Sequence, residues 1–409
     1  MAFTPEQSLR SRRDFPALTK VRDDGLHLAY LDGPGGSQVP KVVIDTMADV
    51  YASCNVNAHG NFPPSAEIDA RMDNARAVLA AFLGAPDGSC ISFGQNMTTL
   101  NYALSSAVAH TLKSGDEIVI TQLDHEANRG PWSRLKAQGI VIQEVRLQAS
   151  GQLDTADMAG KITPRTKLFA IGASSNALGT VNDLKLARRL TRDVGALLVI
   201  DAVHYAPHFP VDVVDLGCDF LLCSAYKFYG PHVGVLYSKP GALNGLPTNR
   251  LVVQDPNAPY RIETGTLNHP AIDGARAAVE YLAGWGDGAT LRERIVDAMT
   301  GISAYEHDLA KFYHDAVRRI PGVRVHGPDF SGRARAPTVS ITHEKFTAEQ
   351  MAKALGREGI CVWDGNFYAE RAVEVLGLAA RGGLLRTGVS LYSSPEDLER
   401  LLAGLKRLT

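Results

Sequence analysis

Short apolar runs alternate with amphipathic stretches through the middle of the chain. The runs of strand length occupy residues 117–122, 141–147, 167–174, 196–203 and 218–225. Stretches with apolar residues at helical spacing lie between them, for example residues 183–195. Strands and helices that alternate in this way predict a largely parallel sheet with helices on both faces. Ligands bind beyond the carboxyl ends of the strands in such sheets.

The pattern becomes helical after about Pro270. Residues 290–320 carry apolar side chains at three- and four-residue spacing over several turns, which predicts one long helix. Shorter runs follow, with a capping-box pattern in Thr347 and Gln350 and a helix N-cap at Ser394. We therefore expect a smaller α/β domain at the C-terminus, joined to the first domain by the long helix.

Composition and charge narrow the class of protein. The 409 residues are 45% hydrophobic, which is enough for two packed cores. Lys+Arg number 42 and Asp+Glu 44, so the formal charge of −2 favours neither nucleic acid nor an anionic membrane as a partner. We find no signal-peptide pattern and no run long enough to span a bilayer, and expect a cytoplasmic protein. The basic cluster of Arg10, Arg12 and Arg13 is expected to be a solvated arm.

The chain shows no sign of a disulfide framework or of a metal site. Its cysteines are odd in number, scattered and never in a CxxC pair, at positions Cys54, Cys90, Cys218, Cys223 and Cys361. Cys218 and Cys223 have apolar neighbours, which predicts buried thiols. His204 and His208 are four residues apart, but Pro207 between them disrupts the helical face that would bring both to one metal.

Two polar residues stand at the ends of buried-type strands. Asp201 ends one apolar run, and Lys227 follows the next. If these strands are parallel neighbours, the carboxylate and the amine meet at one edge of the sheet, where a desolvated lysine has a lowered pKa and becomes nucleophilic. Pyridoxal phosphate requires such a pair, because the amine forms an imine with its aldehyde and the carboxylate keeps its pyridine nitrogen protonated. A structural ion pair explains these two residues equally well.

Further polar residues point to the same edge. Asn96, Met97 and Thr98 stand at the start of a helical pattern, where free N–H groups favour a phosphate, although Thr98 and Thr99 could merely cap the helix. His125 follows an apolar strand and could lie against a flat ring, while a satisfied loop histidine is the commoner explanation. Asn176 follows another strand. Four strand ends that present polar groups to one crevice predict a ligand site.

Several segments together resemble a known family. They are YLDGPGGSQVP, TQLDHEAN, ASSNALGTVNDL, VIDAVHYAPH, CSAYKFYGPHVGVLY, RIETGTLNHPA and LLRTGVSLYSSPEDLERLL. The chain resembles the class V aminotransferases, fold type I of the pyridoxal-phosphate enzymes, and most of all their cysteine desulfurase-like branch. The resemblance implies an α/β fold with a mostly parallel, seven-stranded sheet in a large cofactor-binding domain, residues 31–285. We place a small α/β domain at 286–409 and an N-terminal arm that packs on it at 1–30.

The resemblance also implies roles for residues around the cofactor. Lys227 would form the imine and move the proton at the substrate α-carbon. Asp201 would pair with the pyridine nitrogen, and His125 would stack on the ring. His204 stands where many relatives have a glutamine that reaches the ring hydroxyl.

Phosphate and substrate contacts follow from the same resemblance. Thr98 and Ser224 match phosphate contacts, and Thr266 matches a phosphate contact donated by the other subunit of a homodimer. Asn176 and Arg386 match residues that hold the substrate carboxylate, for which a guanidinium is well suited.

The family pattern is broken in one loop. Cysteine desulfurases carry a cysteine in a stretch resembling Gly-His-His-Cys-Ala, whereas residues 363–371 read WDGNFYAER, with Tyr368 at that position. We expect Tyr368 to face the substrate and Cys361, in an apolar run, to be a packing residue. Relatives also often have histidine in place of Tyr226, before the lysine.

These observations predict an enzyme that acts on an amino acid through Lys227. The outcomes left open are transamination, β-elimination with C–S cleavage, and epimerisation. Desulfuration that uses another thiol and a non-catalytic cofactor-binding subunit are the alternatives. A plain sugar- or nucleotide-binding α/β protein is a third reading.

Overall fold

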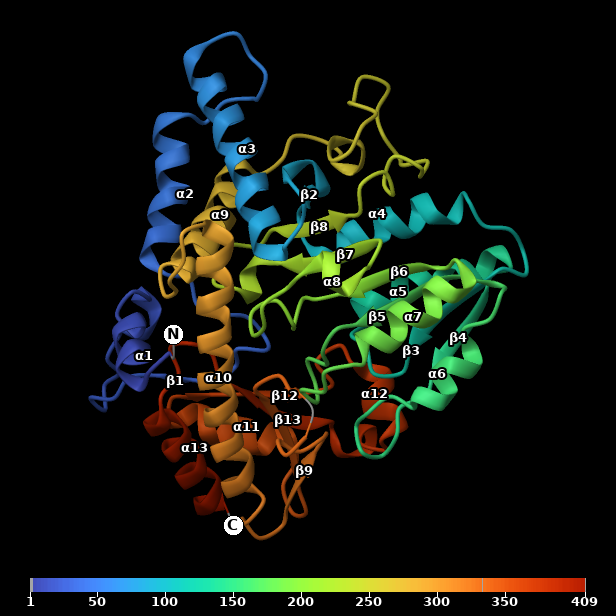
Figure 1. Ribbon diagram of the computed structural model, residues 1–409. Coiled ribbons are helices and arrows are strands. Elements are labelled where there is room, and N and C mark those ends of the chain that lie inside the picture. The colour runs from blue at the N-terminus through green and yellow to red at the C-terminus, as the bar shows by residue number, and fades with distance from the viewer. Residues whose placement is uncertain (1–2, 333, 409) are drawn as a thin grey trace.

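A sheet of seven strands forms the centre of the computed structural model, which describes residues 3–332 and 334–408 (Figure 1). In spatial order the strands are β2 (Ile91–Gly94), β8 (Gly234–Ser238), β7 (Phe220–Ser224), β6 (Leu197–Asp201), β5 (Thr166–Gly172), β3 (Glu117–Thr121) and β4 (Val141–Val145). Neighbouring strands from β4 to β7 pair in parallel, and β8 is antiparallel to both of its neighbours. The predicted mostly parallel sheet of seven strands is confirmed.

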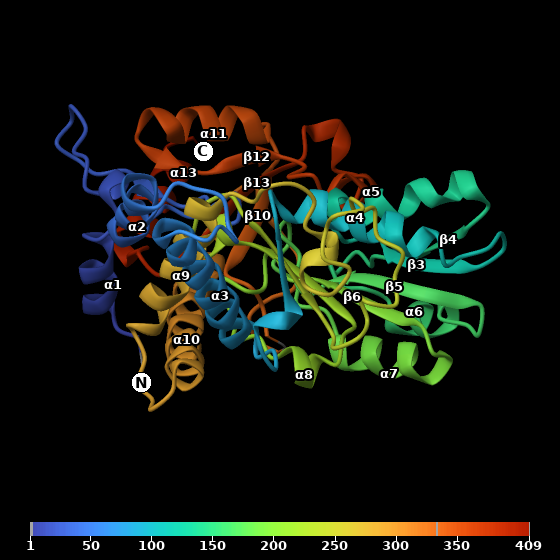
Figure 2. The ribbon, with the colours of Figure 1, turned by 90° about the horizontal axis from the view of Figure 1, so that it is seen from above.

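Side chains of the central strands alternate between two apolar cores, because successive residues of a strand point to opposite faces. Val199 and Leu222 pack in one core with Leu104 of α4 (Met97–Ala109), whereas Ile200 and Leu221 belong to the other core. Seen from above, α4 and α5 (Glu126–Ser133) lie on one side of the sheet, and α7 (Leu184–Val194) and α8 (Val213–Leu216) lie on the other (Figure 2). Helices therefore cover both faces. Helix α6 (Thr155–Lys161) follows β4.

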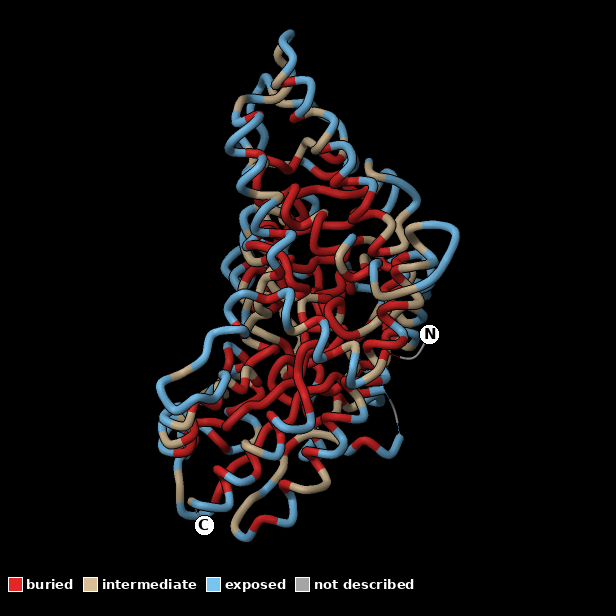
Figure 3. Tube along the Cα trace, turned by 90° about the vertical axis from the view of Figure 1, so that its left-hand side faces the viewer, coloured by how far each residue is buried: buried red, intermediate tan, exposed pale blue. Residues whose placement is uncertain are grey.

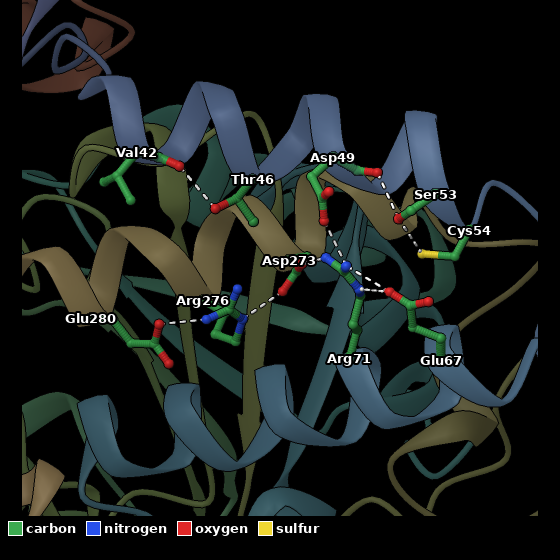
Figure 4. Close-up of polar contacts among 10 residues, drawn as sticks. All are labelled: Val42, Thr46, Asp49, Ser53, Cys54, Glu67, Arg71, Asp273, Arg276 and Glu280. Atoms are coloured by element: carbon green, nitrogen blue, oxygen red, sulfur yellow. Dashed lines mark hydrogen bonds and ion pairs between the residues drawn. The ribbon is translucent and has the colours of Figure 1, made fainter. Parts of the chain in front are cut away.

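Three helices at the β2 edge are joined by ion pairs around Arg71 and a buried carboxylate (Figure 4). They are α2 (Lys41–Ser53), α3 (Pro63–Leu83) and α9 (His269–Ala283). Arg71 of α3 contacts Asp273 of α9 at 2.9 Å and Asp49 of α2 at 2.6 Å. The Asp273 carboxylate is fully buried and also pairs with Arg276 at 2.5 Å. Removing either arginine would leave that buried carboxylate undercompensated, which is strongly destabilising.

A second, antiparallel sheet lies in the C-terminal part of the described chain. Its spatial order is β12 (Trp363–Gly365), β13 (Leu384–Gly388), β10 (Thr338–His343) and β9 (Val323–His326). The helices of this part are α11 (Ala348–Arg357), α12 (Glu370–Val375) and α13 (Pro395–Leu408). The capping box of Thr347 and Gln350 is confirmed, and Ser394 Oγ accepts from Asp397 N at 3.2 Å at the start of α13.

Helix α10 (Leu291–Val317) runs between the two parts as a single helix of 27 residues (Figure 1). It packs on α3 and α9 at one end and on β9, β10 and α13 at the other. This is the long helix that the apolar spacing predicts. The domain boundaries at residues 31 and 286 stay predictions.

The N-terminal segment is fastened to the C-terminal part of the chain. Helix α1 (Pro5–Arg12) is followed by β1 (Ala29–Tyr30), which pairs in parallel with β11 (Ile360–Cys361). Arg12 pairs with Asp397 at 2.8 Å and is only 15% exposed in its side chain. The prediction of a solvated basic arm is therefore wrong for Arg12, because a carboxylate in the first turn of α13 compensates its charge. The first two residues of the predicted arm lie outside the described residues.

Buried residues fill the interior along the whole length of the molecule, and exposed residues lie on the outer turns (Figure 3). Cys218 and Cys223 are buried, as their apolar neighbours predict. Within residues 3–332 and 334–408, no helix combines the length and the apolar character needed to cross a lipid bilayer.

Candidate active site

The carboxyl ends of β6 and β7 meet at one hollow. Asp201 is the last residue of β6, and Lys227 ends η4 (Ala225–Lys227), which directly follows β7. The hollow has a narrow inner compartment of about 80 Å³ and an outer compartment of about 520 Å³. Lys227 and His125 line both, so the two compartments adjoin at these side chains.

The inner compartment gathers most of the residues predicted to bind a cofactor. Those that line it are Asn96, Met97, Thr98, His125, Asn176, Asp201, His204, Ser224 and Lys227. Thr266 does not, since it is exposed in another hollow, which Gln95 and His232 also line and which shares Asn96 with the inner compartment. The two residues predicted to contact substrate besides Asn176, which are Arg386 and Tyr368, line the outer compartment.

The Lys227 amine is held by backbone carbonyl groups. Its Nζ donates to the carbonyl oxygen of Pro34 and, at 3.0 Å, to that of Gly35. Burial, reinforced by the charge of Arg386, lowers the pKa of Lys227 to about 7. The polar contacts of the amine go to carbonyl groups and not to Asp201, so a structural ion pair does not explain this lysine. A lysine with such a pKa is largely a free amine at slightly alkaline pH, which makes it nucleophilic.

Asp201 shares the inner compartment with a second carboxylate. Its Oδ1 accepts from Val203 N at 2.9 Å, and burial together with Asp124 raises its pKa to about 7. The Asp124 carboxylate accepts from Gly172 N and from Asn128 Nδ2, both at 3.0 Å. The sequence reading missed Asp124, although it stands just after β3 and directly before His125, where the strand-end rule applies equally.

His125 begins helix α5 and is neutral at pH 7. Its Nδ1 accepts from Ala127 N at 3.0 Å, which leaves the proton on Nε2. Burial, with smaller effects of Lys227 and Arg386, lowers its pKa to about 4. The ring is stacked with that of Tyr368, with ring centroids 5.4 Å apart and an interplanar angle of 28°.

His204 has one nitrogen bonded and one free. Its Nε2 lies 2.9 Å from Thr338 Oγ1, while Nδ1 is buried without a partner. Burial, then the neighbouring His208, lowers its pKa well below the ordinary range. His208 itself lies 2.7 Å from the Glu306 carboxylate of α10. In the part of the chain that is described, no cluster of His, Cys, Asp or Glu side chains is arranged to hold a metal ion.

Arg386 of β13 is buried beside a carboxylate that the sequence reading missed. Its Nη2 contacts Asp32 Oδ1 at 2.8 Å, and its guanidinium lies 4.3 Å from the ring centroid of Phe367. Burial lowers the pKa of Arg386 and Asp32 opposes this shift. Its Nε atom is buried without a partner. Asp32 follows the short strand β1, and nothing in the sequence around it indicates that it pairs with Arg386.

A loop after β12 closes the outer compartment. Phe367 and Tyr368 both have left-handed backbone conformations, with φ of 56° and 58°, which non-glycine residues rarely adopt. Residues that follow strands of the large sheet hold this loop. Asn176 Nδ2 donates to Phe367 O at 2.9 Å, and Glu126 N donates to Tyr368 O at 2.7 Å. Tyr102 and Trp363 line the same compartment, and sequence reasoning missed both.

The inner compartment fits a ring with polar substituents and a phosphate. Three buried polar atoms at its wall lack a protein partner, namely His204 Nδ1, Ser174 Oγ and Asn176 Oδ1. Such atoms are rare in folded proteins unless a ligand or water satisfies them. The first turn of α4, with Met97 N bonded to Ser224 Oγ at 3.2 Å, offers backbone N–H groups and a helix dipole that suit a phosphate.

Comparison with known proteins agrees with this site. The family described as Aminotransferase class-V matches residues 29–401. The chain belongs to the class-V aminotransferase family. It is 31% identical over 415 residues to a cysteine desulfurase of Pectobacterium carotovorum, covering 98% of this chain and 97% of that one. A cysteine desulfurase of Klebsiella pneumoniae is 32% identical, with 100% and 99% covered.

Two solved structures are similar in fold to this member of the class-V aminotransferase family. The apo structure of a cysteine desulfurase from Thermococcus onnurineus NA1 has a TM-score of 0.88 and 27% identity, and covers 100% of this chain and 99% of its own. A cysteine desulfurase from Escherichia coli has a TM-score of 0.83 and 26% identity, with 100% and 98% covered. The predicted fold type I and the cysteine desulfurase-like branch are confirmed. Members of this family are pyridoxal-phosphate-dependent enzymes, and the residues of the inner compartment fit that cofactor.

Proposed function

We propose that this enzyme holds pyridoxal phosphate in the inner compartment and acts there on an α-amino acid that enters from the outer one. The observation that carries the proposal is Lys227, a half-buried amine with a lowered pKa that lies at the junction of the two compartments. The bound cofactor supplies the electron sink, and the chain supplies orientation, charge and a proton carrier.

The contacts described above support residue roles that the resemblance to the family implies. Lys227 holds the cofactor covalently and carries the proton at the substrate α-carbon. Asp201 supplies the carboxylate for the pyridine nitrogen, and the free Nδ1 of His204 supplies a polar partner for a ring substituent. Neutral His125 offers a flat face. Met97, Asn96, Thr98 and Ser224 form the phosphate cradle at the start of α4.

The substrate carboxylate goes to Arg386 and Asn176. Arg386 Nε is a buried donor without a partner, so it can donate to a carboxylate. Asn176 could donate only through Nδ2, which also donates to Phe367 O, because its free Oδ1 is an acceptor. Tyr368 lines the same compartment and lies next to His125. A guanidinium that Asp32 already orients loses little freedom when it binds a carboxylate.

We infer an aminotransferase or a β-eliminating lyase rather than a desulfurase that uses a loop thiol. By the resemblance, Tyr368 stands where that thiol would be, and the described residues that line either compartment include no cysteine. Cys361 is half-buried on β11, and burial raises its pKa, which lowers its reactivity.

We also propose that the enzyme works in the cytoplasm as a homodimer. Thr266 is exposed and lies outside the inner compartment of its own chain, which suits a residue that contacts the phosphate of a second copy. Light scattering of the purified protein tests whether it is a dimer. The cofactor affinity of Thr266→Ala, compared with that of the parent protein, tests the proposed phosphate contact.

The deciding experiment is the visible spectrum of cofactor-loaded protein during addition of L- and D-amino acids, with product analysis. A keto acid and an aminated cofactor establish an aminotransferase, and pyruvate or a related product with released sulfide or ammonia establishes a lyase. Racemised substrate establishes an epimerase. A spectrum that no amino acid alters, in protein with cofactor attached at Lys227, contradicts the enzymatic proposal and favours a cofactor-binding subunit.

A further inference from the structure

The outer compartment has an aromatic wall, which we define as Tyr102, Trp363, Phe367 and Tyr368. These side chains come from α4, β12 and the loop after β12, and none of them lines the inner compartment. Three of them are large and exposed, at 42% for Tyr102, 57% for Trp363 and 72% for Tyr368. Exposed aromatic side chains that gather at one cavity mark a binding surface, because core packing does not require them there.

The loop that carries part of this wall is fixed in an unfavourable conformation. Two consecutive non-glycine residues with positive φ store strain of roughly 1–3 kcal/mol each. The strain is held by the contacts of the loop with Asn176, with Glu126 and, through Asn366 Oδ1, with Tyr368 N at 3.0 Å. In this loop conformation, the Tyr368 ring lies against the His125 ring and the Phe367 ring lies against the Arg386 guanidinium. A strained loop with such specific side-chain placement is typical of a functional site.

The four residues of the aromatic wall carry no charge. Charged groups beside it include Arg386, which is paired with Asp32, and the Glu126 carboxylate at the mouth, which is 49% exposed and lies 3.5 Å from Arg129 Nε. A charged substrate side chain would therefore meet uncharged rings at the wall. An apolar or aromatic side chain would find ring faces and edges, with which aromatic groups make favourable stacked or edge-to-face contacts.

The geometry points to an α-amino acid with an aromatic or other bulky apolar side chain as the substrate of this enzyme. This inference rests on the proposed function, which places the substrate carboxylate at Arg386 and the α-carbon at Lys227. The side chain must then point away from the inner compartment and into the space bounded by the aromatic wall. A side chain as small as that of cysteine or alanine would leave most of the wall uncontacted.

Spectrophotometric titration of the cofactor-loaded protein tests the inference, with dissociation constants as the readout. We expect L-phenylalanine, L-tyrosine and L-leucine to bind about tenfold or more tightly than L-alanine and L-cysteine, since burying a few extra carbon atoms gives discrimination of that order. Equal or tighter binding of alanine, cysteine, aspartate or lysine would overturn the inference. The covalent link at Lys227, read separately by borohydride reduction and mass spectrometry, reports whether the proposed function itself holds.

Variants locate the preference in the aromatic wall. Trp363→Ala should weaken phenylalanine binding about tenfold and leave alanine binding unchanged. Phe312→Ala is the matched control, because Phe312 is an aromatic residue of α10 that is 44% exposed and lines neither compartment. If Trp363→Ala misfolds by circular dichroism, Tyr102→Ala replaces it. Undiminished phenylalanine binding in a folded wall variant contradicts the assignment.

Discussion

The two compartments of the active site differ in how the chain builds them. The inner one is made by residues that directly follow strands of the central sheet, and its Asp201 and His204 are 7% and 4% exposed. The outer one is made by a helix of the large sheet and a strained loop beside the small sheet, and its Tyr368 is 72% exposed. The residues proposed for the chemistry thus follow strands of the central sheet, whereas those proposed to select a substrate come from α4, β12 and the loop after β12.

Removing the lysine between the compartments should have the largest effect. Lys227→Ala deletes the amine that attaches the cofactor, so turnover should be abolished while the cofactor still binds noncovalently. Mass spectrometry after borohydride reduction and a turnover assay measure both effects. Lys239→Ala, on a lysine whose side chain is 59% exposed, is the matched control. A covalent adduct or retained turnover in Lys227→Ala would refute the role of this residue.

Arg386 separates binding in the outer compartment from chemistry in the inner one. Arg386→Ala should mainly raise KM, by an amount equivalent to roughly 2–5 kcal/mol. It also leaves Asp32 buried and unpaired, which should lower the free energy of unfolding by roughly 3–5 kcal/mol. Thermal unfolding and steady-state kinetics measure the two effects. Adding Asp32→Asn should recover stability without recovering KM, and an unchanged KM in Arg386→Ala would contradict carboxylate binding.

Asp201 tests the inner compartment alone. Asp201→Asn keeps the shape of the side chain but removes the carboxylate, so kcat should fall by roughly 10² while substrate affinity changes little. Because the native environment already opposes the charge of Asp201, unfolding should be little affected. Asp124→Asn is the informative comparison, since it removes a charge that raises the pKa of Asp201. Wild-type kcat in Asp201→Asn would show that the carboxylate has no part in the chemistry.

The pH dependence of cofactor attachment should show the smallest but most diagnostic effect. Only the free amine attacks an aldehyde, and the pKa of Lys227 is lowered to about 7. The attachment rate of apoprotein should therefore rise about tenfold per pH unit below that value and level off above it, by the definition of a pKa. Stopped-flow absorbance measures the rate. A rate that keeps rising to about pH 10 would indicate an ordinary, solvated lysine.

The local pattern of apolar residues was sufficient to predict the strands and the residues that follow them. The ends of β3, β5, β6 and β7 could be placed within a few residues, because buried strands read as short apolar runs. Parallel strands bring their carboxyl ends to one edge, so His125, Asn176, Asp201 and Lys227 could be grouped without coordinates. Asp124 follows the same strand end as His125, so the same rule could have predicted it.

Periodicity and strand ends were enough to predict the sheet, the long helix and most residues of the inner compartment, because a short window of sequence contains each of these signals. Long-range contacts were needed to reveal the Asp32–Arg386 pair, the partial burial of Arg12 and the aromatic wall. These features bring together residues hundreds of positions apart, such as Asp32 and Arg386, and no local rule states which distant segments meet. Conformation mattered as well, since the left-handed backbone of Phe367 and Tyr368 exists only where surrounding contacts hold it.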